Sequence, residues 1–434
     1  MIIRPAKFIN GTISIPGDKS VSHRAVIIAA MAEGETRIEN YATGEDCAST
    51  IKCIRQLGVE VEQHGTSVVV RGVGKSGFRK PHEPMDCGNS GTTMRLMAGL
   101  LAGQAFDSVL TGDESLLSRP MKRIIEPLRL TGAEIDSQAG SAPLIIHGRN
   151  PLKPIRYEMP VSSAQVKSCV LIAGLNAEGA TSVVEKTQTR DHTERMLRWL
   201  GADLTVSSGD KDGNVIAVDG SSILNARDIS VPGDISSAAF FVVAAACLPG
   251  SAIKICHVGI NGSRAYLLGK LHSLGVDVRT TGKEESGLEP VADIRIHGTG
   301  TPGPTNGSNI IYGDETAQMI DEIPILAVLG TQLQGGLEVR DAKELRIKET
   351  DRIAAICENL RRMGADVEEF DDGFRVGKSP LKAAKIDSFG DHRIAMAFAV
   401  AGLAADRETE ITDHEAADIS FPGFYELLES IVKR

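Results

Sequence analysis

The sequence predicts an α/β (α+β) protein of two similar domains, each built from about three copies of one module. Two observations predict this class: a short phrase recurs five times, and a motif near the start returns near the middle. In the phrase, an apolar helical turn is followed by a glycine and then by a run in which apolar and polar residues alternate. This order is typical of a helix that ends in a C′ glycine and is followed by a strand. Its copies are IRQLGVEVE (54–62), LRLTGAEID (128–136), LRWLGADLTV (197–206), LHSLGVDVRT (271–280) and LRRMGADVEEF (360–370).

The spacing of these phrases sets the size of the module. Their glycines are 74, 69, 74 and 89 residues apart, which is too long for a solenoid repeat. The period fits a module of several strands and two helices that the chain uses about six times. The glycines are Gly58, Gly132, Gly201, Gly275 and Gly364.

The second observation divides the chain into two halves. ISIPGDKSVSHRA at 13–25 reappears as ISVPGDISSAAFF at 229–241. We therefore expect one domain at 18–231 and a second formed by 1–17 and 232–434, with the chain crossing between them near Pro16 and Pro232. The crossings would form a hinge, and the cleft between the domains is the expected ligand site. The apolar run at 240–248 is predicted to be a core helix.

Composition limits the possible partners. The chain has 434 residues and a net charge of −10, which argues against a nucleic acid or an anionic membrane as partner. No run reaches the ~18 apolar residues of a membrane span, and the start lacks the apolar region of a signal peptide, so we expect a cytoplasmic protein. The seven cysteines are scattered without metal-ligand spacing, which predicts neither disulfides nor a structural metal.

Basic side chains stand where several helices are predicted to begin. The helix macrodipole disfavours a cation there by about 0.3–1 kcal/mol. A solvated arginine explains any single case, but the set indicates a small, strongly anionic ligand, because helix N-termini and basic side chains together bind phosphate and carboxylate. The set comprises Lys19, Arg24, Arg95, Arg352 and Arg393.

The PGDKSVSHR motif gives the best internal comparison. A helix that starts at Ser20 places Arg24 one turn later on the same face. The second copy, PGDISSAAF, has neither charge, so the fold does not require Lys19 or Arg24. We infer that these two cations serve function, whereas His23 and His192 are expected to be structural.

Three further helix starts carry polar side chains with two explanations each. In GNSGTTMR and SSAQVKS, small and polar residues either cap the helix or let backbone N–H groups approach an anion. In IDEIPILAV, one of Asp321 and Glu322 is expected to cap the apolar run and the other to face the cleft.

The segment ELRIKETDRIAAICENLRRMG has the densest pattern. Glu349 lies three residues before Arg352, on the same side of the helix start. A carboxylate among cations stays ionised, but an anionic substrate beside it favours the protonated form and makes it a possible acid. The alternative is a surface charge network. The buried stripe of this helix is expected at Ile353, Ile356, Leu360 and Met363.

Seven ordered motifs resemble the 5-enolpyruvylshikimate-3-phosphate synthases over nearly the whole chain: PGDKSVSHR, GNSGTTMR, SRPM, SSAQVKS, IDEIP, RIKETDR and DHRIAM. The resemblance implies two domains of three βαβαββ units each, closing over the substrates. It implies transfer of the enolpyruvyl group of phosphoenolpyruvate to the 5-hydroxyl of shikimate 3-phosphate, with release of phosphate, in aromatic amino-acid biosynthesis. It also implies that the protein is a target of glyphosate, that it is a monomer, and that it uses no metal or organic cofactor.

The same resemblance assigns the site. It implies that three residues are catalytic: Asp321 takes the hydroxyl proton, Glu349 protonates the methylene carbon, and Lys19 assists. For shikimate 3-phosphate it implies Lys19, Ser20, Arg24, Ser163, Ala164, Gln165, Arg190, Asp321 and Lys348. For phosphoenolpyruvate it implies Lys19, Asn89, Gly91, Arg119, Gln165, Arg352, His392 and Arg393.

The chain departs from the family pattern at several positions. Ala164 stands where many members have a second serine of the phosphate site, and Arg190 is expected to supply the missing contact. Glu344 replaces an asparagine of other members, and Ile419 stands where some have a lysine. Gly91 leaves the small-residue position of the phosphoenolpyruvate site without a methyl group, so glyphosate tolerance is not fixed by the sequence.

Two alternatives remain at this point. An enzyme similar to UDP-N-acetylglucosamine enolpyruvyl transferase would carry a reactive cysteine in the loop TGDESLLSRP, which has none. A non-catalytic phosphometabolite-binding scaffold would have lost a carboxylate, but Asp321 and Glu349 are both present. No P-loop, strand-linked G-x-G-x-x-G or serine nucleophile elbow occurs, which argues against nucleotide, NAD and serine-hydrolase chemistry.

Overall fold

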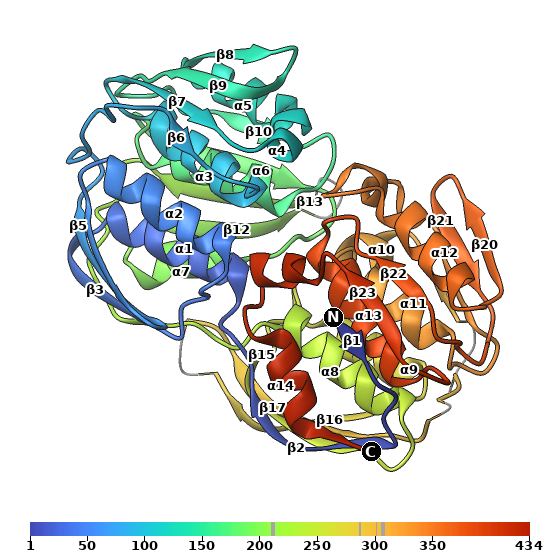
Figure 1. Cartoon of the computed structure of the whole chain (residues 1–434). Helices are drawn as coiled ribbons and strands as arrows, with labels where there is room; N and C mark the ends of the chain where they lie inside the picture. The colour runs from blue at the N-terminus through green and yellow to red at the C-terminus, as the bar shows by residue number, and fades with distance from the viewer. Residues whose placement is uncertain (210–212, 286–287, 301, 305–308) are drawn as a thin grey trace. The chain divides into compact units, whose positions relative to one another are not determined.

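The computed structural model describes residues 1–209, 213–285, 288–300, 302–304 and 309–434. The chain divides into two compact units. We call Gly17–Val231 with Gly287–Glu289 the N-proximal unit. Met1–Pro16, Pro232–Ser286 and Pro290–Arg434 form the C-proximal unit. Helices and strands alternate along both (Figure 1), so the α/β class is confirmed.

The N-proximal unit contains three four-stranded sheets with the same internal order. The sheets run β14-β3-β5-β4, β6-β7-β9-β8 and β10-β11-β13-β12. In each, the first pair is parallel and the other two pairs are antiparallel. The strands are β3 (Glu33–Glu39), β4 (Glu60–His64), β5 (Ser67–Val73), β6 (Met85–Asp86), β7 (Asp107–Thr111), β8 (Glu134–Gln138), β9 (Ser141–His147), β10 (Arg156–Glu158), β11 (Ala180–Glu185), β12 (Leu204–Gly209), β13 (Gly213–Asp219) and β14 (Ile229–Ser230). The helices are α1 (Lys19–Ala30), α2 (Glu45–Gln56), α3 (Gly91–Ala102), α4 (Glu114–Ser118), α5 (Lys122–Leu130), α6 (Ala164–Gly174) and α7 (His192–Trp199).

The C-proximal unit repeats this plan with more variation. Its sheets run β16-β17-β15-β2-β24, β18-β19-β21-β20 and β1-β23-β22. The strands are β1 (Ile2–Ile3), β2 (Phe8–Ser14), β15 (Ala252–Gly259), β16 (Asp277–Glu284), β17 (Val291–His297), β18 (Ile310–Ile311), β19 (Leu337–Val339), β20 (Val367–Phe370), β21 (Gly373–Val376), β22 (Lys385–Asp387), β23 (Thr409–Thr412) and β24 (Val432–Lys433). The helices are α8 (Ile235–Cys247), α9 (Tyr266–Ser273), α10 (Asp314–Gln318), α11 (Ile323–Gly330), α12 (Arg352–Arg362), α13 (His392–Leu403) and α14 (Phe424–Ile431), with 3-10 turns η1 (Lys343–Ile347) and η2 (His414–Ile419).

The recurring phrase takes its predicted form at all five places. In each, a helix ends, a glycine adopts a left-handed φ between 77° and 95°, and a strand begins within five residues. Such a φ strains any residue with a Cβ, which explains why glycine recurs. The helix and strand pairs are α2 and β4, α5 and β8, α7 and β12, α9 and β16, and α12 and β20.

Two strands pair outside the unit of the helix that follows them. β2 comes directly before the first PGD motif, yet it pairs in parallel with β15 of the C-proximal unit. β14 comes directly before the second PGD motif, yet it pairs in parallel with β3 of the N-proximal unit. The chain therefore changes unit between each of these strands and the next helix.

Each unit is organised around three buried helices (Figure 1). α1, α3 and α6 contact one another in series in the N-proximal unit, and α8, α11 and α13 are in mutual contact in the C-proximal unit. Every residue of α8, α11 and α13 is buried, which is typical of helices that are apolar on all sides. The core helix predicted at 240–248 corresponds to the second part of α8, which ends one residue earlier, at Cys247. These six helices also begin at the motifs that the sequence singled out.

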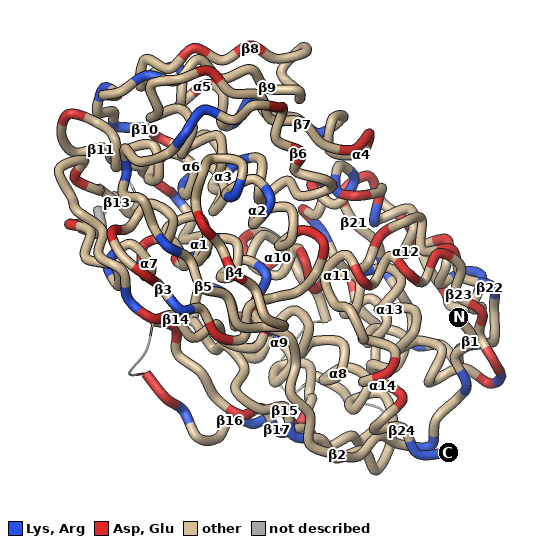
Figure 2. Tube along the Cα trace, turned by 60° about the vertical axis from the view of Figure 1, so that its left-hand side comes forward, with Lys and Arg blue, Asp and Glu red and all other residues tan. Residues whose placement is uncertain are grey.

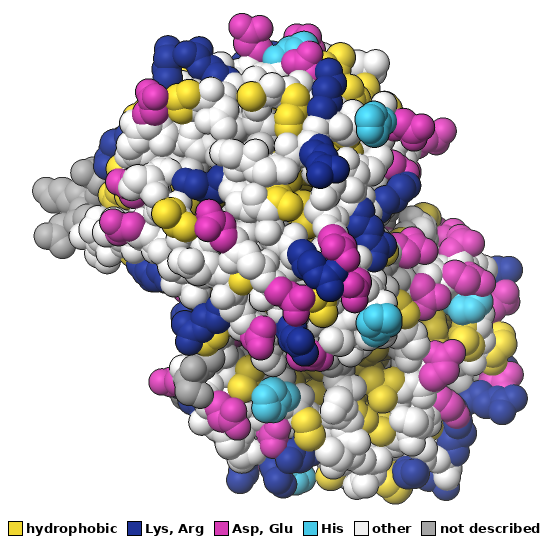
Figure 3. Space-filling view, turned by 90° about the vertical axis from the view of Figure 1, so that its left-hand side faces the viewer, with side chains coloured by type: hydrophobic (Ala, Val, Ile, Leu, Met, Phe, Trp, Pro, Cys, Tyr) yellow, Lys and Arg dark blue, Asp and Glu magenta, His cyan; other side chains and the backbone are white. Residues whose placement is uncertain are grey.

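Charges are mixed over the surface. Basic and acidic residues alternate along the trace in Figure 2, and on the face shown in Figure 3 lysines and arginines are interspersed with acidic side chains. All seven cysteines lie in the described part of the chain and are free. No described helix is long and apolar enough to cross a membrane.

Candidate active site

The start of α1 holds a lysine against a carboxylate. Asp18 caps the helix by accepting a hydrogen bond from the backbone N–H of Val21 at 2.9 Å. Lys19 is the first helical residue, one position earlier than the start predicted at Ser20, and its Nζ donates to Asp46 Oδ2 at 2.9 Å. The ammonium is therefore fixed at a helix N-terminus by a partner that the sequence did not reveal.

Arg24 is buried one turn further along α1, and its hydrogen-bond partners within the described ranges are neutral oxygens. Its guanidinium donates to the carbonyl of Ser20 at 2.8 Å, to Thr193 Oγ1 at 2.8 Å and to Ser168 Oγ at 2.9 Å. Among the described residues, no carboxylate forms an ion pair with it. Burial lowers the pKa of Arg24 to about 10; Glu194 opposes this shift and Arg190, which precedes α7, adds to it. The cation is thus positioned without being neutralised.

The starts of α3 and α6 lie side by side. Ser90 caps α3 through the N–H of Thr93 at 3.1 Å, and Ser163 caps α6 in the same way. Gln165 links the two helices, because it donates to Thr92 Oγ1 at 2.9 Å and accepts from Arg95 Nη1 at 2.8 Å. The capping explanation offered by the sequence therefore holds for both serines, and the approach of backbone N–H groups to an anion stays a prediction.

The predicted phosphoenolpyruvate residues of this unit are also together. Arg119 is 9% exposed and donates from Nη2 to Asn89 Oδ1 at 2.6 Å and to Ser115 Oγ at 3.1 Å. A Cβ on Gly91 would lie 2.6 Å from Arg95 Nη1 and 3.5 Å from Arg119 Nη1. The glycine therefore makes room for the guanidinium of Arg95 at the start of α3, whereas the distance to Arg119 would be an ordinary contact. Ala164 is the first residue of α6, beside Ser163.

In the C-proximal unit, Arg352 joins three carboxylates. It is the first residue of α12, is 1% exposed, and donates to Asp391 at 2.7 Å and to Glu349 at 2.6 Å. Its Nη1 lies 3.7 Å from Asp321 Oδ1. Burial lowers the pKa of Arg352, but the charges of Asp391, Glu349 and Asp321 outweigh it and raise the pKa above the ordinary value. The residue stays a cation with both predicted catalytic carboxylates, Asp321 and Glu349, beside it.

The start of α13 supplies a second cation to Asp321. Asp391 caps α13 and accepts from the N–H of Arg393 at 2.8 Å. Arg393 Nη1 donates to the carbonyl of Asp321 at 2.7 Å, and its Nη2 lies 3.9 Å from Asp321 Oδ2. His392, the first residue of the helix, is buried. Lys348 follows η1, and its Nζ donates to Glu344 at 3.2 Å. The glutamate that replaces the family's asparagine at position 344 is therefore a partner of a lysine predicted to bind substrate.

One expectation was wrong, and several contributing residues were missed. Glu322 occupies the N-cap position of α11 without a side-chain capping bond, because its carboxylate accepts from Ser236 instead. Asp46, Thr193 and Arg264 hold predicted site residues although no motif marked them. Ser168, the last residue of the SSAQVKS motif, holds Arg24 although it was not singled out within that motif. Their partners are distant in sequence, so no local pattern could have identified them.

His23 is buried beneath the start of α1, as expected of a structural histidine. Its Nδ1 shares a 2.6 Å hydrogen bond with Thr50, which in turn bonds to Thr93 at 2.7 Å. Burial, followed by the charges of Lys19 and Arg24, lowers the pKa of His23 well below its ordinary value. The folded protein therefore excludes a proton that the unfolded chain takes up.

This difference predicts a pH dependence of stability. Below about pH 6.5 the unfolded state binds the proton and the folded state does not, so His23 removes up to about 1.4 kcal/mol of stability per pH unit. We expect the fall in Tm between pH 7 and pH 5 to be smaller in His23→Gln than in the unmodified protein. Thermal unfolding followed by circular dichroism at both pH values measures it, and an equal fall in both proteins contradicts the prediction.

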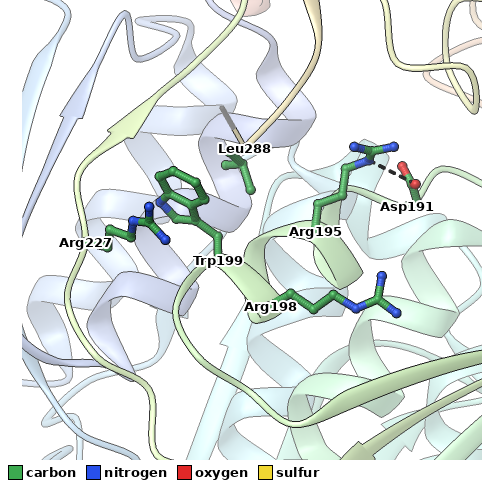
Figure 4. A pocket seen from close by; sticks show the side chains of 6 residues that line it. All are labelled: Asp191, Arg195, Arg198, Trp199, Arg227 and Leu288. Carbon is green, nitrogen blue, oxygen red and sulfur yellow. Dashed lines mark hydrogen bonds and ion pairs between the residues drawn. The ribbon is translucent and has the colours of Figure 1, made fainter. Parts of the chain in front are cut away.

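A separate hollow of about 370 Å³ lies in the N-proximal unit (Figure 4). It is lined by Asp191, Arg195, Arg198, Trp199, Arg227 and Leu288. Arg195 bonds to Asp191 at 3.0 Å, and the guanidinium of Arg227 stacks 3.4 Å from the centre of the Trp199 ring. None of the predicted site residues lines this hollow. Over the ranges that the structure describes, no cluster of His, Cys, Asp and Glu could hold a metal ion.

Two units of repeated sheets and helices, with basic residues at the starts of α1, α12 and α13, define a two-unit α/β protein. Residues 3–428 match the family model described as EPSP synthase (3-phosphoshikimate 1-carboxyvinyltransferase). The chain belongs to this family, which confirms the resemblance found in the sequence.

Individual relatives agree over the full length. Proteins named 3-phosphoshikimate 1-carboxyvinyltransferase from Brevibacillus brevis and Solibacter usitatus are 48% and 49% identical, with 99% of each chain covered. The solved EPSP synthase of Acinetobacter baumannii is 41% identical with a TM-score of 0.86, covering 99% of this chain and 98% of that one. The enolpyruvyl transferase NikO from Streptomyces tendae, at 17% identity, a TM-score of 0.77 and coverages of 99% and 96%, shares the fold.

Proposed function

We propose that this chain transfers the enolpyruvyl group of phosphoenolpyruvate to the 5-hydroxyl of shikimate 3-phosphate and releases phosphate, a step of aromatic amino-acid biosynthesis. The observation that carries the proposal is the position of Arg352, which contacts Glu349 at 2.6 Å and lies 3.7 Å from Asp321. One buried cation thus stands beside both candidate catalytic carboxylates, the base Asp321 and the acid Glu349. The activity after which the family is named, 3-phosphoshikimate 1-carboxyvinyl transfer, supports the same reaction.

The two units supply different parts of the proposed site. In the N-proximal unit, shikimate 3-phosphate is bound by Lys19, Ser20, Arg24, Ser163, Ala164, Gln165 and Arg190, and phosphoenolpyruvate by Lys19, Asn89, Gly91, Arg119 and Gln165. In the C-proximal unit, Asp321 and Lys348 bind the first substrate, and Arg352, His392 and Arg393 the second. In this assignment, cations from both units engage the same pair of anions. We therefore predict that the units close over the substrates. Such orientation contributes up to about 7–11 kcal/mol.

The chemistry follows from the charges around the acids. In the proposal, Asp321 takes the proton of the 5-hydroxyl of shikimate 3-phosphate. The oxygen of that hydroxyl at the same time bonds to carbon 2 of phosphoenolpyruvate. Glu349 protonates the methylene carbon, assisted by Lys19. An anion that engages Arg352 draws positive charge away from Glu349 and thereby favours its protonated form. Phosphate then leaves as a methyl proton returns to a base.

Mixing the purified protein with both substrates tests the reaction. We expect phosphate release only when phosphoenolpyruvate and shikimate 3-phosphate are both present. NMR should detect an enolpyruvyl ether in the same amount as the released phosphate. Release with UDP-N-acetylglucosamine in place of shikimate 3-phosphate would support the related enzyme instead. Binding of both substrates without release would support the non-catalytic scaffold.

Arg119 provides a prediction about substrate binding. Arg119→Ala removes a charge-assisted contact to phosphoenolpyruvate, which is worth about 1.5–3 kcal/mol, so we expect KM for phosphoenolpyruvate to rise by about 10–150-fold. KM for shikimate 3-phosphate should change far less. Steady-state kinetics with each substrate varied measures both, with the exposed Arg123→Ala on α5 as a control of the same unit. Equal rises for the two substrates would remove Arg119 from the phosphoenolpyruvate site.

Two expectations about the whole molecule stay predictions. We expect a monomer, which sedimentation of the full chain measures, and a cytoplasmic protein. No result described above bears on either one.

A further inference from the structure

Arg264 is a buried arginine of the C-proximal unit that belongs to none of the sequence motifs. It lies just before α9 and is 4% exposed. Its Nη1 is 3.8 Å from Asp321 Oδ2. The turn that carries Asp321, between α10 and α11, therefore faces a third guanidinium besides those of Arg352 and Arg393.

Protein groups hold Arg264 in place. Its Nη2 donates to Ser236 Oγ at 2.6 Å and to Asp234 Oδ1 at 3.4 Å, and its Nη1 lies 3.7 Å from Glu322 Oε1. Ser236 also donates to Glu322, and Asp234 caps α8 through the N–H of Ser236 at 2.8 Å. The network therefore connects the start of α8 to the turn that carries Asp321.

This network explains what the second PGD motif does. The first copy, PGDKSVSHR, keeps its cations within the motif at Lys19 and Arg24. The second copy keeps the aspartate and the serine, as Asp234 and Ser236, but lacks both cations. In the C-proximal unit these two residues hold the guanidinium of Arg264 instead. The cation comes from another segment and is directed at Asp321.

The three guanidinium groups near Asp321 differ in what else they can do. Arg352 and Arg393 lie 3.7 and 3.9 Å from its carboxylate, and both are proposed to bind phosphoenolpyruvate. Arg264 is held by Ser236, Asp234 and Glu322 and has no proposed ligand. When an anionic substrate engages the other two, Arg264 is the cation that continues to fix the carboxylate.

We propose that Arg264 is a positioning residue for Asp321, fixing the carboxylate that takes the hydroxyl proton. This inference rests on the proposed function, in which Asp321 is the proton acceptor. Arg264 contacts neither substrate in the proposal, so its removal affects the chemical step rather than binding. A misplacement of about 1 Å in a catalytic group can cost about 10²-fold in rate.

The variants are Arg264→Ala and Arg264→Lys, with Lys270→Ala as the matched control. Lys270 is another buried cation of the same unit, on α9, and pairs with Glu315 at 2.8 Å. We expect Arg264→Ala to lower kcat by about 10²-fold, with KM for both substrates changed by less than about threefold. Arg264→Lys keeps a charge and should recover part of kcat. Lys270→Ala should keep the kcat of the unmodified protein, even if its Tm falls as much as that of Arg264→Ala.

A double variant separates positioning from a general loss of structure. If Arg264 acts through Asp321, Arg264→Ala should have less than about a threefold further effect on kcat in the Asp321→Asn protein. The same factor of loss in both backgrounds would overturn the inference. So would a rise in both KM values with kcat retained, or full activity of Arg264→Lys and Arg264→Ala. If the alanine variant does not fold, the lysine variant provides the same cycle. An inactive unmodified protein would refute the proposed function, and the inference with it.

Discussion

Asp321→Asn is expected to lower kcat by about 10²–10⁴-fold, the usual contribution of a general base. The amide has nearly the shape of the carboxylate but cannot accept the hydroxyl proton. It also keeps the backbone carbonyl that accepts from Arg393 at 2.7 Å, so the turn before α11 should remain in place. Both KM values should change much less than kcat.

Phosphate release under saturating substrates measures this effect. Asp366→Asn is a suitable control, because Asp366 is an exposed carboxylate of the same unit and its backbone N–H bonds to Ser379, which is not one of the proposed site residues. It should keep the activity of the unmodified protein. An Asp321→Asn protein that retains more than about a tenth of kcat would show that another group takes the proton.

Arg352→Met is expected to have the largest effect on stability. It leaves the carboxylate of Asp391, which is fully buried, without its 2.7 Å partner. Breaking a buried pair by removing one partner costs about 3–5 kcal/mol. For a unit of about 200 residues this corresponds to a fall in Tm of about 6–20 °C, together with loss of activity. Calorimetry of the full chain measures it.

Two further variants show whether the buried charge is the cause. Arg375→Met breaks a 2.9 Å ion pair between Arg375 and Glu368 that is more than half exposed, so its Tm should change little. Arg352→Met combined with Asp391→Asn should recover part of the lost stability, since asparagine still caps α13 but carries no charge. No recovery in the double variant would mean that lost packing, rather than an unpaired carboxylate, destabilises the protein.

The parts of the fold that could be predicted are those set by neighbouring residues. The five helix–glycine–strand phrases were predicted because a left-handed glycine and the apolar spacing before it lie within about ten residues. The pairing of β2 with β15 and of β14 with β3 joins residues more than 180 positions apart, for which the sequence contains no local signal.

The candidate site divides in the same way. Lys19, Arg352 and Arg393 were placed at helix starts because a capping residue directly precedes each helix. Glu322 was expected either to cap α11 or to face the cleft, and it does not cap because Ser236 and Arg264 offer it buried partners. Arg264 itself could not be recognised, since its importance comes from residues 28 to 58 positions away.

The exchange of leading strands has a consequence for synthesis on the ribosome. β2 is made before Gly17–Val231, but its parallel neighbour β15 starts only at Ala252, after that segment. The nascent chain must therefore carry an unmatched strand edge while the whole of Gly17–Val231 emerges, and unmatched edges are open to wrong pairing. The N-proximal unit, in contrast, contains its own β14 and can finish its sheets first. Vectorial synthesis thus favours an order of maturation in which the C-proximal unit, completed last, recruits a strand that was made before the N-proximal unit.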